Sequence, residues 1–108
     1  MCMEKWKEIK IPGIVKIERF IAEFEVWELA KIPYGKFKVK IFESMDGSYT
    51  GRTNIMVVDR TNSFCAGIGK GSTVSDALQD TIRFFYLLVD EVDDLTEESF
   101  KYVDSVDF

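Results

Sequence analysis

The sequence of 108 residues contains no histidine, two cysteines and two prolines. Without histidine, Ser-His-Asp and Cys-His catalysis are excluded, and the commonest neutral metal ligand is missing. Cys2 and Cys65 are far apart and form no C-x-x-C motif, which argues against a zinc cluster or a disulfide framework. We therefore expect no catalytic residues, no bound metal and no cofactor, and the two thiols fit a reducing cytoplasm.

Long apolar segments are lacking as well. The longest run, Phe84 to Val89, is far shorter than the ~20 residues that span a bilayer. The N-terminus mixes Glu4 and Glu8 with lysines and does not lead into a signal sequence. We expect a cytoplasmic protein without membrane contact, which would act in the host cell if it is phage-encoded. The length suits a single domain, residues 1–108, around one core.

Negative charge is concentrated near the C-terminus. Residues 89–108 hold eight acids and one base and so carry a charge of −7. The first 88 residues carry +2, which gives the overall net charge of −5. An acidic segment argues against nonspecific nucleic-acid binding and favours docking to a basic protein; the alternative is a solubilising surface. The candidate partner-binding residues are Asp90, Glu91, Asp93, Asp94, Glu97, Glu98, Tyr102, Asp104 and Phe108.

Alternating apolar residues predict strands in the middle of the chain. Lys36 to Glu43 is the clearest strand, because Phe37, Val39 and Ile41 alternate with Lys36, Lys38 and Lys40. Turn signals at Pro33-Tyr34-Gly35, Asp46-Gly47 and Asn62-Ser63 divide this strand from its neighbours. Two further strands are expected, Tyr49 to Asp59 and Phe64 to Ile68.

The segment from Ile14 to Ala30 fits two periodicities. Ile17, Phe20, Ile21 and Phe24 fall at helical spacing, whereas the residues around Phe24 alternate as in a strand. We expect a short helix or turn that gives way to a strand near Phe24 to Lys31.

The strongest helix pattern runs from Val74 to Val92, with Thr73 as N-cap and Asp76 three residues later. A second, short helix is expected to begin after an N-cap at Thr96. The predicted fold class is α+β: an antiparallel meander of three or four strands packed by one long helix, plus a short C-terminal helix.

A glycine-rich stretch, Gly67 to Thr73, precedes the long helix, where backbone N–H groups favour an anion. It matches neither the Walker nor the dinucleotide pattern, and the alternative is a tight turn that needs positive φ. Lysines at alternate positions of the clearest strand form either a phosphate-contacting stripe or a solvated face. The possible anion-binding residues are Lys36, Lys38, Lys40, Gly69, Lys70, Gly71, Ser72 and Thr73.

Two further surfaces leave alternatives open. Glu43, Asp46 and Asp59 stand at predicted strand ends and could hold Mg²⁺ if they converged, although turn chemistry also explains them. Phe84, Tyr86 and Leu87 form a second stripe on the long helix, to be covered by the N-terminal segment or by a partner, including a second copy in a homodimer.

Residues 37–91 resemble the partial RNase H-like domain of HicB-type antitoxins. The resemblance rests on a strand, the hairpin Asp46-Gly47-Ser48-Tyr49, two strands, and Gly71-Ser72-Thr73 leading into Asp76-Ala77-Leu78. The Pro-rich loop of that family is replaced by residues 59–63, and we expect no C-terminal DNA-binding module and hence no autorepression. The resemblance implies a β-β-β-α fold and a small ribonuclease toxin as partner.

We therefore expect a small, acidic, non-enzymatic protein that neutralises a basic nucleic-acid-handling partner. It would be antitoxin-like, or a phage-type inhibitor of a nuclease such as a CRISPR effector, with carboxylates in a groove built for phosphates. The alternative is a nucleic-acid or nucleotide-binding module that uses the Lys36/Lys38/Lys40 face and the Gly67–Thr73 loop.

Overall fold

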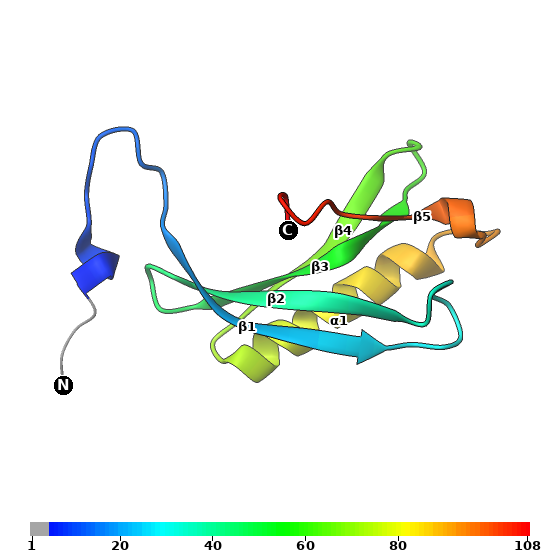
Figure 1. Ribbon diagram of the computed structural model, residues 1–108, viewed down its shortest axis with the longest axis horizontal. Coiled ribbons are helices and arrows are strands. Elements are labelled where there is room, and N and C mark those ends of the chain that lie inside the picture. Colours follow the sequence, from blue (N-terminus) through cyan, green and yellow to red (C-terminus); the bar gives the residue numbers. More distant parts are fainter. Residues whose placement is uncertain (1–4) are drawn as a thin grey trace.

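The computed structural model describes residues 5–108, so Cys2 lies outside the described residues. An antiparallel sheet of order β1-β2-β3-β4 is covered on one face by α1, and this arrangement confirms the α+β prediction (Figure 1). The elements are η1 (Lys5–Glu8), β1 (Glu18–Trp27), β2 (Lys36–Ser44), β3 (Tyr49–Val58), β4 (Phe64–Gly71), α1 (Val74–Asp90), η2 (Glu97–Ser99) and β5 (Phe100–Tyr102).

The core lies between α1 and the inner face of the sheet. Phe37, Val39 and Ile41 of β2 are fully buried, as the alternation predicts, and the ring of Phe37 lies 5.3 Å from that of Phe85 on α1. The intervening lysines point to the other face. We call that other face, which α1 does not cover, the open face.

Tight turns connect the strands where the sequence predicts them. Gly35 and Gly47 have φ of +76° and +86°, and Asn62 in the β3–β4 turn has φ of +67°. Such left-handed conformations are tolerated by glycine and, less well, by asparagine. These turns fix the meander.

Strand β1 runs from Glu18 to Trp27, so the short helix or turn expected between Ile14 and Phe24 is absent, and the strand begins and ends earlier than predicted. The pairing of β1 with β2 shifts register between Phe20 and Ala22. A bulge of this kind adds a residue to one strand and breaks its alternation. The helical spacing of Ile21 and Phe24 therefore falls within an irregular edge strand, and Ile17 lies just before it.

The glycine-rich stretch is a strand and not a loop. Gly67, Gly69 and Gly71 belong to β4 and face α1, where an added Cβ at Gly71 would lie 2.5 Å from the nitrogen of Ala77. The only glycines with positive φ in residues 5–108 are Gly13, Gly35 and Gly47. The expectation of a tight positive-φ turn is wrong, because these glycines instead let the helix backbone lie directly on the strand.

Helix α1 starts as predicted. The hydroxyl of Thr73 accepts a hydrogen bond of 3.1 Å from the N–H of Asp76, which satisfies a free donor of the first turn. The helix ends at Asp90, slightly before the expected Val92. The predicted second helix is reduced to the single 3-10 turn η2, which leads directly into β5, a strand that the sequence analysis missed.

Strand β3 changes its neighbour along one edge. Its first half pairs with β2, and its second half pairs with β5. Asn54 stands at the change: its side-chain oxygen accepts from the N–H of Lys38, and its carbonyl accepts from the N–H of Val103, both at 2.7 Å. The C-terminal strand β5 thereby joins the sheet through its pairing with β3.

An N-terminal arm, residues 5–17, reaches beyond the end of the sheet (Figure 1). It contacts the body through an ion pair of 2.6 Å between Lys7 and Glu43, whose carboxylate is largely buried. No helix in the described part of the chain is both long and apolar enough to cross a bilayer.

Candidate functional site

Six exposed carboxylates gather where α1 ends and η2 begins, and we call this cluster the acidic end. Its only ion pair in residues 5–108 joins Asp90 to Lys31, at 2.8 Å. Across a pocket of about 190 Å³ lie Asp59 and Arg60 from the β3–β4 turn. The members of the acidic end are Asp90, Glu91, Asp93, Asp94, Glu97 and Glu98.

The acidic end sits at the unfavourable terminus of the helix dipole. The backbone N–H of Glu91, the C-cap, bonds to the carbonyl of Leu88 and that of Val92 bonds to Val89, and no basic residue occupies the last turn. A helix C-terminus carries partial negative charge and is stabilised by cations. Asp90 and Glu91, at this terminus, are therefore not explained by the stability of α1.

One side of the acidic end is fixed by the connection between β1 and β2. Tyr86 donates a hydrogen bond of 3.3 Å to Glu28, and the ammonium of Lys31 lies 5.5 Å from the Tyr86 ring centroid. The hydrogen bond to Asp90 raises the pKa of Lys31. Partial desolvation opposes ionisation of Glu28, but hydrogen bonds from the N–H groups of Lys31 and Ala30 lower its pKa overall. This connection, and not the N-terminal segment, covers Tyr86.

The carboxylate of Asp59 organises the adjacent turn. One of its oxygens accepts from the hydroxyl and the N–H of Thr61 and from the N–H of Ser63, at 2.7 to 3.0 Å. The hydrogen bond from the Thr61 hydroxyl is the main cause that lowers the pKa of Asp59 to about 2. The other oxygen accepts from the thiol of Cys65, which raises the pKa of Cys65.

Two predicted partner-binding residues lie apart from the acidic end. Tyr102 donates a hydrogen bond of 2.8 Å to the carbonyl of Lys36, and its ring centroid lies 5.4 Å from that of Tyr34. Phe108 lies against Lys40 on the open face, and Asp104 starts the turn that brings it there. The structure thus divides the predicted acidic surface into two regions.

The predicted lysine stripe is largely neutralised by β1. Lys36 pairs with Glu25 at 3.6 Å and Lys38 pairs with Glu23 at 4.0 Å. Opposite charges on adjacent strands stabilise a sheet by modest amounts. Lys40 is the one lysine of the stripe that has no carboxylate oxygen within 4.0 Å among the described residues.

The other predicted anion-binding groups meet the chain's own carboxylates. The N–H of Lys70 bonds to Asp80, and its ammonium lies 3.9 Å from Asp46. The hydroxyl of Ser72 donates a hydrogen bond of 3.5 Å to the carboxylate of Asp76, whose N–H donates the capping bond to Thr73. Gly69 and Gly71 face the helix backbone. The segment is thus a closed strand-to-helix junction.

The three carboxylates considered for Mg²⁺ are engaged at separate places. Glu43 pairs with Lys7, Asp46 accepts from the N–H and hydroxyl of Ser48, and Asp59 holds its own turn. The hydroxyl of Ser48 is the main cause that lowers the pKa of Asp46. No group of three or more carboxylate or thiol side chains suited to a metal ion occurs within residues 5–108.

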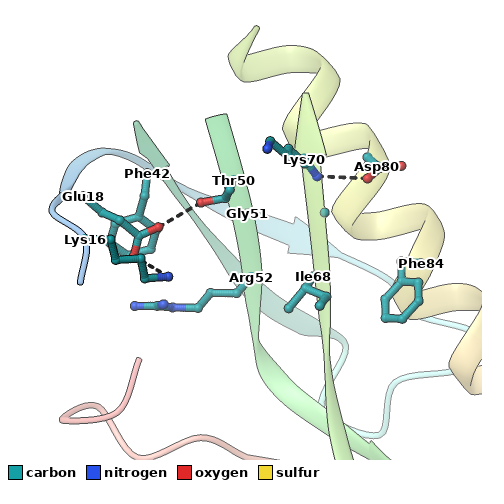
Figure 2. Close-up of a pocket in the computed structure, with 11 residues that line it drawn as sticks. Lys16, Glu18, Phe42, Thr50, Gly51, Arg52, Ile68, Lys70, Asp80 and Phe84 are labelled. Atoms are coloured by element: carbon teal, nitrogen blue, oxygen red, sulfur yellow. Dashed lines mark hydrogen bonds and ion pairs between the residues drawn. The ribbon is translucent and has the colours of Figure 1, made fainter. Parts of the chain in front are cut away.

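A cleft of about 430 Å³ opens at the edge of the open face, and the sequence analysis did not identify it. Figure 2 shows Lys16, Phe42 and Arg52 on the side of the sheet away from α1, with Ile68 between Arg52 and Phe84. Strand alternation places Arg52 beside the lysine stripe. Neither the contribution of Lys16 nor that of Phe84 carries a local sequence signal, because each comes from a distant segment.

Comparison with protein-family models, curated proteins and solved structures finds no significant match to this chain. The resemblance to HicB-type antitoxins therefore rests on its quoted turn and cap motifs.

Proposed function

We propose that this chain is a non-enzymatic binding protein that neutralises a basic, nucleic-acid-handling protein through its acidic end. The observation that carries the proposal is the exposure and pairing of the six carboxylates of the acidic end. They are exposed, and only Asp90 has a cationic partner within residues 5–108. Carboxylates at such positions can occupy a groove that otherwise holds phosphates.

The position of the acidic end supports a role in binding. Acids at a helix C-terminus cost stability, and Asp90 and Glu91 occupy that terminus of α1. The resemblance to HicB-type antitoxins would make the partner a small ribonuclease toxin. A phage-type inhibitor of a host nuclease, including a CRISPR effector, makes the same physical claim.

The alternative of a nucleotide or nucleic-acid module is less well supported. Lys36 and Lys38 have glutamate partners, and the Gly67–Thr73 segment is packed against α1. Neither surface presents a row of unpaired donors to a phosphate backbone.

The test is affinity capture from cells that encode the chain, at low and high salt, with bound proteins and nucleic acids both identified. A double variant, Asp93→Asn with Asp94→Asn, removes two unpaired carboxylates. Its control, Ser75→Lys with Gln79→Lys, gives the same change in net charge on an exposed part of α1 away from the acidic end.

The wild type and the control should retain a basic nuclease, lose it at high salt, and inhibit its activity in a purified assay. The double variant should bind that nuclease at least tenfold more weakly, since each tenfold corresponds to about 1.4 kcal/mol. Equal capture by both variants, or recovery of nucleic acid without a nuclease, would contradict the proposal.

A further inference from the structure

Within the described residues 5–108, Phe108 anchors the segment 104–108 to the open face through Arg52 and Lys40. The N–H groups of Asp107 and Phe108 both bond to the carbonyl of Asp104, at 2.9 and 3.0 Å, and this turn directs Phe108 back to the sheet. The four residues before Phe108 are exposed, and Val106 retains 92% of its accessible surface. The segment is a small loop with one docked residue.

The contacts of Phe108 are specific in their chemistry. Arg52 donates a hydrogen bond of 3.0 Å from its guanidinium to the main-chain oxygen of Phe108. The ammonium of Lys40 lies 4.4 Å from the centroid of the Phe108 ring, in the geometry of a cation–π contact. Arg52 thus recognises a backbone acceptor, and Lys40 recognises an aromatic face.

Aromatic rings line the place where Phe108 docks. The guanidinium carbon of Arg52 lies 4.3 Å from the Phe42 ring centroid, and Phe20 lies 5.8 Å from Phe42. Lys40 also lies 5.4 Å from the Phe20 centroid. The Nε atom of Arg52 is buried and has no hydrogen-bond partner. A buried donor of this kind gains from an additional acceptor.

The cleft of Figure 2 continues from this place past Arg52, and Phe108 does not line it. Its far end offers the ammonium of Lys70 and the apolar surfaces of Ile68 and Phe84. A ligand longer than one residue therefore finds cationic and apolar surface in continuity with the Phe108 position.

We propose that the open face binds an acidic peptide segment that carries an aromatic residue, and that residues 104–108 occupy part of this site in cis. The peptide supplies a ring to Lys40 and a main-chain oxygen to Arg52, as Phe108 does, and its acidic character is that of residues 104–108. The groups recognised here are an aromatic ring and a main-chain carbonyl, and Glu18 and Asp80 line the same cleft, so a continuous row of phosphates fits it poorly. This site is independent of the acidic end and does not rest on the proposed function.

The test uses the full chain and a fluorescent peptide with the sequence Tyr-Val-Asp-Ser-Val-Asp-Phe, that of residues 102–108, amidated so that it offers a carbonyl. Binding is measured by fluorescence anisotropy for the wild type, for Phe108→Ala, and for Val106→Ala as a control in the same segment. Residues 104–108 compete with the added peptide for the site. If they fill it in nine-tenths of the molecules, the apparent affinity for the peptide falls about tenfold. Phe108→Ala should therefore bind the peptide about tenfold more tightly than the wild type and Val106→Ala.

Adding Lys40→Gln or Arg52→Gln to Phe108→Ala should abolish the gain, and a peptide ending in alanine should not bind. Circular dichroism checks that each variant is folded, and Lys40→Gln keeps the test valid if Arg52→Gln does not fold. Equal peptide affinity for the wild type and Phe108→Ala would overturn the proposal. So would binding of a single-stranded oligonucleotide, but not of the peptide, to Phe108→Ala.

Discussion

The side chain of Thr53 replaces a backbone group in the hydrogen-bond ladder opposite Gly67. The N–H of Gly67 donates to the Thr53 hydroxyl at 2.8 Å, and this hydroxyl donates to the carbonyl of Ile55 at 2.7 Å. The pairing of β3 with β4 is interrupted between Arg52 and Met56, so Gly67 has no regular partner there. The hydroxyl is fully buried and satisfies a donor and an acceptor at once.

Replacing Thr53 by valine should destabilise the protein by about 1–3 kcal/mol, because it leaves a buried N–H without an acceptor. Thr53→Ser keeps the hydroxyl and loses only a methyl group, so its loss should be smaller. Urea denaturation monitored by circular dichroism gives both values. A valine variant as stable as the serine variant would show that the ladder closes without the hydroxyl.

Gly69→Ala should destabilise the fold by about 1–3 kcal/mol or more, because the new methyl group overlaps the backbone of Thr81 on α1. Ile68→Ala, at a half-exposed neighbour on the other face of β4, should cost much less. Thermal unfolding compares the two variants. Similar melting temperatures would contradict the close approach of α1 to β4.

Stability should depend on pH through Asp59. Its pKa is lowered from 3.8 to about 2 by the hydrogen bonds of its turn, so the folded state favours the ionised form. The stabilisation is fully present above pH 3.8 and is lost as the pH falls through about 2. The difference in unfolding free energy between the wild type and Asp59→Asn should shrink over that interval. Asp93→Asn is the control, and a difference that does not change with pH would argue against this turn.

Glu91→Gln should stabilise the protein by about 0.3–1 kcal/mol at low ionic strength, because it removes a negative charge from the C-terminus of α1. The gain should shrink in high salt. Glu97→Gln, outside the helix, should give no such gain. Chemical denaturation at two salt concentrations measures the effect. Destabilisation by Glu91→Gln would mean that the negative charge of Glu91 is not unfavourable at the C-terminus of α1.

Much of the fold follows from local sequence patterns. The alternation in Lys36 to Glu43 specified β2, and Thr73 with Asp76 specified the start of α1. The error in β1 arose from its bulge, which brings apolar residues to helical spacing. Strand β5 was missed because it has three residues and exists only where β3 leaves β2.

The candidate surfaces were predictable to different degrees. The exposure of the acidic end follows from composition, since a run of carboxylates is rarely buried. The contact between Arg52 and Phe108 joins residues 56 positions apart, so no local pattern indicates it. The glycines at positions 67, 69 and 71 did carry a signal, a period of two, which is the period of a strand and not of a phosphate loop.

The bare glycine surface of β4 has a mechanical consequence for the helix above it. Side chains between packed elements normally separate the two backbones and can change rotamer when the elements shift. Here the backbones of β4 and α1 lie in direct contact, without side chains of β4 between them. Rotation or sliding of α1 would bring its backbone into collision with β4. The helix therefore keeps one fixed orientation on the sheet. Asp90 and Glu91, at its C-terminal end, are therefore held at a constant position relative to the sheet.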